Sequence, residues 1–246
     1  MKRRLLGMVF VFWTLCSGCT TINRVRKNQT LYFVGAFTNW TFEPMTRDMR
    51  NPAKFRMGRF FTWKEGGNFK FGVNPSSWKN MYHPAIADAP YDYRIAIRDS
   101  ADDHTWRMKE GECGRAYKMV FDTSVWPMRF DMTPFDPLAD ISMEGDAVEG
   151  AARFAQVGDN RYVYTWRGPL KRGRLVLTAK DDSRAFRIEP WKDGLTPDGT
   201  MQQIDISETA AEAAPRAWQI ETAGLYTIIL DQLADYIVIE RGGGVQ

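Results

Sequence analysis

The chain carries a loose internal repeat, in which the second copy follows the first at an offset of about 110 residues. The first copy opens with LYFVGAFTNW and the second with ISMEGDAVEG, which places Gly35 and Gly145 in register. Because the order of elements is the same in both copies, the sequence predicts two tandem copies of one domain. We align four tryptophans between the copies and assign them to the cores, Trp63 with Trp166 and Trp106 with Trp218.

Apolar and polar side chains alternate along the strands expected in each copy. Side chains of a strand point to opposite faces with period two, which puts Phe69, Phe71 and Val73 on a core face and Lys70 on the outward face. Short apolar runs separated by Gly, Pro, Asn and Asp are typical of all-β proteins. The sequence therefore predicts an all-β fold with two tandem immunoglobulin-like β-sandwich domains.

We expect the first β-sandwich at 29–132 and the second at 139–242. Pro134 and Pro137 lie in the segment between them, where they would stiffen a short linker. The alanine-rich stretch 207–217 is the weakest helical candidate, because Pro215 would end a helix there, and we expect a turn or loop insertion.

The N-terminus has the pattern of a secretory leader. MKRR supplies positive charge, LLGMVFVFWTL an apolar stretch shorter than the ~20 residues needed to span a bilayer, and CSGC a small-residue cleavage site. We expect a signal peptide at 1–18, lipidation of Cys19 and a polar tether at 19–28, with simple secretion as the alternative. Thr20 after the lipidated cysteine resembles the signal for a Gram-negative outer membrane, so we expect a lipid-anchored outer-membrane protein, at the cell surface.

Removal of this leader changes both the charge and the cysteine count. It removes three basic residues and no acidic one, so the formal net charge falls from +3 to zero. A nucleic-acid partner would need a basic surface that this balance does not indicate. Cys16 leaves with the leader and Cys19 would carry lipid, so only Cys113 remains and no intramolecular disulfide is expected.

Few residues have the pattern of a catalytic or metal site. His83 and His104 are the two histidines, and neither stands in a metal-binding spacing. The glycines of the C-terminal GGGVQ precede no helix that could bind phosphate. We expect no enzyme activity, no metal and no cofactor. A glycoside hydrolase stays open as an alternative, because its carboxylate pair is defined in space; loop candidates are Asp92, Asp102, Asp103, Asp181 and Asp182.

Trp40, Lys70 and Trp78 form a candidate binding constellation in the first copy. Trp40 follows a turn, Lys70 is outward on its strand, and Trp78 lies in the polar loop GVNPSSWKNMYHP. A flat indole can contact the apolar face of a sugar ring while lysine donates hydrogen bonds to its hydroxyls. The alternatives are a tryptophan that plugs the end of the sandwich and a merely solvated lysine.

The segments LYFVGAFTNWTFEPM and FTWKEGGNFKFGVNPSSW resemble the starch-binding repeats of SusE/SusF-type outer-membrane lipoproteins. The first copy is also similar to family 48 glycogen-binding modules, in which a turn tryptophan, a strand lysine and a second tryptophan form the sugar platform. This resemblance implies Trp40, Lys70 and Trp78 as ligand contacts, with Asn39 and Asn74 as supports. It also implies non-catalytic binding of a starch-like α-glucan and partnership with outer-membrane glycan uptake proteins.

The second copy lacks this constellation. It has no tryptophan at the position of Trp40, and Val176 stands where Lys70 would be. Since the core tryptophans recur and these two residues are lost together, we predict that Trp40 faces ligand. We expect a degenerate, structural second repeat. A shifted second site is the alternative, for which the candidates are Trp191, Arg187 and Lys192.

The sequence thus favours a surface lipoprotein that binds starch-like α-glucan and supports polysaccharide capture and uptake. One alternative is a structural lipoprotein whose exposed aromatics contact another protein of an outer-membrane complex, since aromatic residues are also enriched at interfaces. The other is the glycoside hydrolase. The glycan linkage is not predicted, because an indole stacks against many sugars.

Overall fold

The computed structural model describes residues 29–98, 103–150, 152–181, 184–209 and 214–242. The expected leader, Cys19 and the tether lie outside these residues. Within them the chain is all β, apart from two short 3-10 helices, η1 (Ala36–Thr38) and η2 (Glu110–Glu112). None of the described helices is long and apolar enough to cross a membrane.

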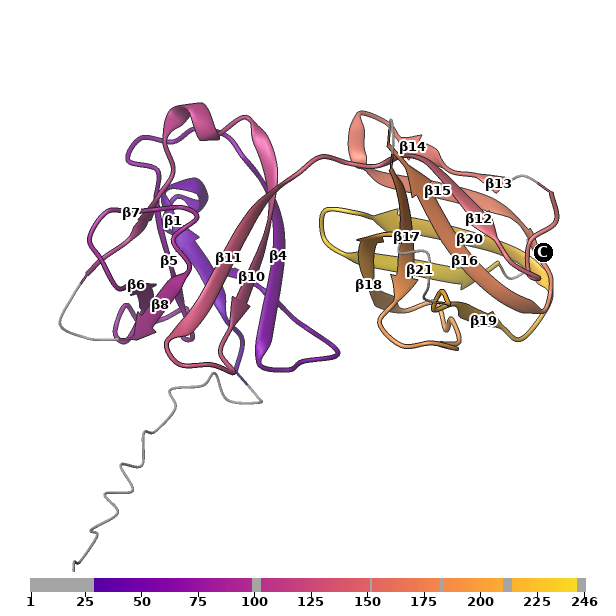
Figure 1. Ribbon diagram of the computed structural model, residues 1–246, viewed down its shortest axis with the longest axis horizontal. Coiled ribbons are helices and arrows are strands. Elements are labelled where there is room, and N and C mark those ends of the chain that lie inside the picture. The colour runs from indigo at the N-terminus through magenta and orange to yellow at the C-terminus, as the bar shows by residue number, and fades with distance from the viewer. Residues whose placement is uncertain (1–28, 99–102, 151, 182–183, 210–213, 243–246) are drawn as a thin grey trace, which may run out of the picture.

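The first domain is one strongly folded sheet, with the strand order β2-β1-β5-β6-β8-β11-β10-β4-β3. Figure 1 shows β1, β5, β6 and β8 in one layer, opposite β4, β10 and β11. Its strands are β1 (Tyr32–Gly35), β2 (Glu43–Pro44), β3 (Thr46–Arg47), β4 (Lys54–Phe61), β5 (Asn68–Gly72), β6 (Tyr82–Pro84), β7 (Ala89–Pro90), β8 (Ile95–Arg98), β9 (Trp106–Arg107), β10 (Arg115–Asp122) and β11 (Met128–Phe135).

The second domain repeats this topology. Its order is β13-β12-β16-β17-β18-β21-β20-β15-β14, and β19 pairs with β16 as β9 pairs with β5. Two tandem β domains are therefore confirmed. The strands are β12 (Ala139–Glu144), β13 (Ala152–Arg153), β14 (Ala155–Val157), β15 (Asn160–Leu170), β16 (Gly173–Lys180), β17 (Ala185–Pro190), β18 (Met201–Glu208), β19 (Trp218–Ile220), β20 (Gly224–Asp231) and β21 (Tyr236–Arg241).

Each core contains one fully buried tryptophan at the same place in the topology. Trp106 pairs with Phe69 of β5, and Trp218 pairs with Leu175 of β16. Both indole N–H groups are satisfied, by the Tyr93 carbonyl at 2.7 Å and by Oε1 of Gln202 at 2.9 Å. The surrounding core is rich in phenylalanine in the first domain and in leucine and isoleucine in the second.

Gly35 and Gly145 also occupy equivalent places, where a neighbouring strand leaves no room for a side chain. A Cβ on Gly35 would lie 2.3 Å from the carbonyl oxygen of Asn68, and one on Gly145 would lie 2.4 Å from that of Arg174. Gly145 in addition has a φ of +105°, which side-chain-bearing residues rarely adopt. The two glycines are thus required by close approach of the backbone.

The alignment of Trp63 with Trp166 is wrong. Trp166 lies within β15 opposite Ile228 and packs against the second core, whereas Trp63 lies beyond the end of β4 and is not among the residues that pack on the first core. In β4 the residue that faces the corresponding position of β10 is Met57, which pairs with Met119. The alignment based on the shared Thr-Trp dipeptide is therefore displaced by several residues from the structural equivalence.

Pro134 lies in β11 and not in the linker. It pairs with Tyr117 of β10, and the second sheet begins at Ala139. Among the described residues, β11 is paired on its β8 side only as far as Phe130, whose amide donates to the Arg94 carbonyl, so a proline without an amide hydrogen is tolerated at position 134. The alanine-rich stretch 207–217 includes the end of β18, and 210–213 lie outside the described residues.

The turn between β20 and β21 docks on the outer face of the first domain, and the two domains lie side by side in Figure 1. A Cβ on Gly58 would lie 1.7 Å from the Leu233 carbonyl oxygen, so only glycine permits this approach. Gln232 fixes the linker, because its side-chain amide exchanges two 2.9 Å hydrogen bonds with the backbone of Leu138. The domains therefore share a close-packed interface.

Ion pairs cross this interface. Lys118 pairs with Asp235, and the guanidinium of Arg56 lies 3.3 Å from Asp205 and 3.8 Å from Asp235. Burial lowers the pKa of Lys118 and raises the pKa of Asp235, in both cases against the attraction between the two charges. Because of this desolvation, removal of either partner would leave the other as a buried charge that is costly to keep.

Candidate functional site

The segment GAFTNW leaves β1 through η1 and presents Trp40 to solvent. The Gly35 amide donates to Thr38 Oγ1 at 3.2 Å, and the Trp40 amide donates to the Gly35 carbonyl at 2.8 Å. Asn39 and Trp40 both adopt left-handed backbone conformations, with φ of 48° and 60°. Such a conformation is ordinary for asparagine but uncommon for a bulky residue, and costs on the order of 1–3 kcal/mol. The turn therefore holds an exposed indole in a strained position.

Trp40 and Trp78 come together as the sequence predicted, and Phe42 joins them. The indole centroids of Trp40 and Trp78 lie 6.0 Å apart with planes at 61°, and Phe42 packs against Trp78 at 4.9 Å. Trp40 is 44% exposed and Trp78 50%. We call Trp40, Trp78 and Phe42 the aromatic platform. Phe42 was missed, although the sequence signal, an aromatic residue two positions after Trp40, was present.

Lys70 lies under Trp78. It pairs with Val34 in the ladder and points away from the core phenylalanines, as expected, but it is only 6% exposed rather than solvated. Its Nζ lies 5.6 Å from the Trp78 ring centroid and forms an ion pair with Asp103, whose side chain is 88% exposed. The outward face of β5 is covered here because the Trp78 loop folds over it. Asp103 was missed as a member of the site.

The two asparagines have different places. Asn39 is exposed within the η1 turn, beside Trp40. Asn74 shapes the loop that carries Trp78, because its Oδ1 accepts from the Ser76 amide at 3.0 Å and its carbonyl from the Ser77 amide at 3.1 Å. Asn74 therefore supports the platform through the loop.

His83 and His104 meet edge to face near Asp103, with ring centroids 5.6 Å apart. Nε2 of His83 and Nδ1 of His104 are buried and have no partner among the described residues. Among all the described residues, no group of three or more His, Cys, Asp or Glu side chains could hold a metal ion. Burial, with Glu112 and Glu110 nearby, raises the pKa of the Cys113 thiol, which is the reverse of what a nucleophilic cysteine needs.

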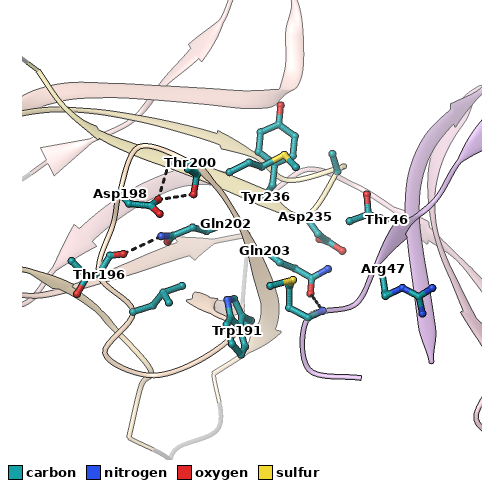
Figure 2. Close-up of a pocket in the computed structure, with 14 residues that line it drawn as sticks. Thr46, Arg47, Trp191, Thr196, Asp198, Thr200, Gln202, Gln203, Asp235 and Tyr236 are labelled. Atoms are coloured by element: carbon teal, nitrogen blue, oxygen red, sulfur yellow. Dashed lines mark hydrogen bonds between the residues drawn. The ribbon is translucent and has the colours of Figure 1, made fainter. Parts of the chain in front are cut away.

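Among its described residues, the second domain has no equivalent of the aromatic platform. Val176 pairs with Glu144 where Lys70 pairs with Val34, which agrees with the sequence alignment. Trp191 follows β17 and is half-buried at a pocket of about 400 Å³ between the domains, shown in Figure 2. Arg187 and Lys192 do not line this pocket. The three candidates for a shifted second site therefore do not converge on one cavity.

No family model matches the chain, and no curated protein matches it. Among solved structures the chain is similar to SusF from Bacteroides thetaiotaomicron, with 13% sequence identity and a TM-score of 0.38. The match covers 89% of this chain and 50% of that one, so the chain spans about half the length of that structure.

Proposed function

We propose that the protein binds a starch-like α-glucan on the aromatic platform, without catalysis, as a lipid-anchored surface protein that supports polysaccharide capture and uptake. The observation that carries this proposal is the pair of exposed indoles, Trp40 and Trp78, set at 61° to each other. Large exposed aromatics that meet each other are unusual on a protein surface without a binding role.

The geometry suits a curved chain of sugar rings. Each indole offers an apolar face for the C–H groups of one ring, and the angle between the indoles follows the bend of an α-glucan helix. Polar groups stand at the edge: the Asn39 side chain beside Trp40, and the carboxylate of Asp103, held by Lys70. The carboxylate accepts hydrogen bonds from sugar hydroxyls, whereas the amide both donates and accepts.

The left-handed conformation of Trp40 also supports a ligand-facing role. Strained backbone at a bulky residue persists where the surrounding structure maintains it, and such positions cluster at binding sites. A tryptophan that only filled the end of the sandwich would be buried, whereas Trp40 is 44% exposed.

A single platform of this size buries little surface, so weak affinity for one oligosaccharide is expected. Several platforms on one membrane, tethered through lipid on Cys19, would engage one polymer together and gain avidity. The partners implied are the α-glucan, the membrane and the outer-membrane proteins that import the captured glycan.

Isothermal titration calorimetry of the chain from Thr20 on, with maltoheptaose and with amylose, tests this function. We expect heat of binding at millimolar oligosaccharide and a higher apparent affinity for amylose. An absence of heat with both glucans would rule the function out. Unchanged reducing-end content of the glucan after incubation is the expected result for a protein that does not hydrolyse it.

A further inference from the structure

The pocket at Trp191 lies between the two domains, and none of the three platform residues lines it. Its volume is about 400 Å³, within the range of roughly 300–1,000 Å³ typical of small-molecule sites. The first domain contributes Met49, and the second contributes Trp191 and Gln203. Figure 2 shows Trp191 on the opposite side of the cavity from Tyr236 and Thr200. An aromatic residue thus lies on each of two opposite sides of the cavity.

Interdomain contacts preform this cavity. The Met49 amide of the first domain donates to Gln203 Oε1 of the second at 2.8 Å. The close approach of Gly58 to Leu233 fixes the same two surfaces. A ligand would therefore enter a site that is already assembled, which lowers the ordering cost of binding.

Two of the three charged residues that line the cavity, Arg47 and Asp235, are engaged with other groups. The Arg47 guanidinium donates to the Pro52 and Gln29 carbonyls and stacks on Phe55, and Figure 2 shows it directed away from the cavity. Asp235 is paired with Lys118. The cavity therefore offers no uncompensated charge of either sign from these two residues, which favours a neutral ligand.

Asp198, the remaining charged residue of the lining, accepts hydrogen bonds from the amide and hydroxyl of Thr200 at 2.9 and 2.5 Å. These bonds lower its pKa, so it stays an acceptor for hydroxyl groups. Two hydrogen-bond donors at the cavity complement the Asp198 carboxylate. The indole N–H of Trp191 and the amide NH₂ of Gln203 donate to no acceptor among the described residues.

We propose that this cavity binds one end of a neutral glycan chain, with a sugar ring against Trp191 and its hydroxyls bonded to Gln203 and Asp198. A sugar ring combines an apolar face with hydroxyls that donate and accept at its rim, and this cavity offers an aromatic surface together with the Asp198 carboxylate as an acceptor for those hydroxyls. The site is separate from the aromatic platform. It rests on the proposed function only for the choice of a maltooligosaccharide as the probe.

Two-dimensional NMR of the indole N–H groups tests the site, because each tryptophan gives one signal. Trp191→Phe, Trp40→Phe and Trp78→Phe assign three signals, and Trp106, buried in the first core with its indole N–H on the Tyr93 carbonyl, serves as an internal control. Maltotriose is then titrated into the chain from Thr20 on and into the Trp40→Ala/Trp78→Ala double variant, which lacks the platform.

We expect the Trp191 signal to shift and saturate in both proteins while the Trp106 signal stays fixed. In the double-variant background, Trp191→Ala should weaken maltotriose binding at least tenfold by calorimetry. If Trp40 and Trp78 respond but Trp191 does not, the glucan function stands and the cavity site is wrong. If only Trp191 responds, the platform function is wrong and the cavity site stands. If none responds, both proposals fail.

Discussion

The indole rings of Trp40 and Trp78 meet at 61°, with their centroids 6.0 Å apart, although 37 residues and four strands of the chain come between them. The η1 turn presents one ring and the loop shaped by Asn74 presents the other. Neither ring fills a core, so binding and stability are separable at this site.

Trp78→Ala should abolish detectable glucan binding while lowering the free energy of unfolding by only about 1 kcal/mol, the scale of an exposed aromatic contact. Urea denaturation and calorimetry measure the two effects. Trp126→Ala is the matched control, because Trp126 is 54% exposed and lies in the turn between β10 and β11, outside the platform. A loss of about 3–5 kcal/mol, as expected for truncation of a core tryptophan such as Trp106, would make Trp78 structural.

Lys70→Met should weaken maltoheptaose binding about tenfold, which corresponds to roughly 1.4 kcal/mol. Methionine keeps the apolar stem under Trp78 but removes the ammonium group that fixes Asp103. Since Asp103 is exposed, it is not left as a buried unpaired charge, and stability should change little. Calorimetry and thermal melting together test this, and unaltered affinity would exclude Lys70 from the site.

Gly58→Ala should disrupt the docking of the domains. The added Cβ would lie 1.7 Å from the Leu233 carbonyl oxygen, so the β20–β21 turn has to move. We expect a larger radius of gyration by small-angle X-ray scattering and loss of about 1–3 kcal/mol of stability from overpacking. Gly111→Ala is the control, since nothing lies within 4 Å of its added Cβ. An unchanged scattering curve for Gly58→Ala would contradict this interface.

Removal of one partner of the Lys118–Asp235 pair should cost roughly 2–3 kcal/mol, because the other charge stays buried with incomplete compensation from its remaining neighbours. The double variant Lys118→Met/Asp235→Leu should be close to the native stability or above it. Lys54→Met, at the more exposed pair with Asp122, should change stability by less than about 1 kcal/mol. Additive losses in the double variant would contradict this account.

Alkaline pH should destabilise the protein through Tyr117. Burial, together with Tyr91, raises the pKa of its hydroxyl to about 12, and it donates to the Glu112 carbonyl at 2.6 Å. The unfolded state loses this proton near pH 10, so the stability from Tyr117 is complete below about pH 10 and lost as pH rises toward 12. Urea midpoints measured between pH 8 and pH 11.5 should fall less steeply for Tyr117→Phe than for the native protein; equal slopes would contradict the assignment.

The fold could be predicted because two of its signals can be read directly along the sequence. Apolar and polar residues alternate within each strand, and the order of elements recurs in the second copy. Gly35 and Gly145 were aligned correctly since the same backbone approach requires both. Trp63 was aligned with Trp166 because both follow a threonine. The true equivalence depends on the register of β4 on its partner strand β10, which the sequence does not show. Pro134 was assigned to the linker because the sequence does not show that one side of β11 is unpaired.

The sequence picked out residues that the structure brings together at the candidate site, but it did not predict how they are arranged. Trp40 and Trp78 stood out because polar turn and loop residues surround them. The burial of Lys70 could not be predicted, since it depends on how the Trp78 loop folds over β5. The cavity at Trp191 lies between domains and depends on their docking, which no pattern within one repeat encodes.

A crystal structure of the protein with maltoheptaose tests the central claim most directly. The account predicts consecutive glucose rings stacked on Trp40 and Trp78, with hydroxyls near Asn39 and Asp103. Maltoheptaose bound elsewhere on the chain, with both indoles of the platform open to solvent, would contradict it.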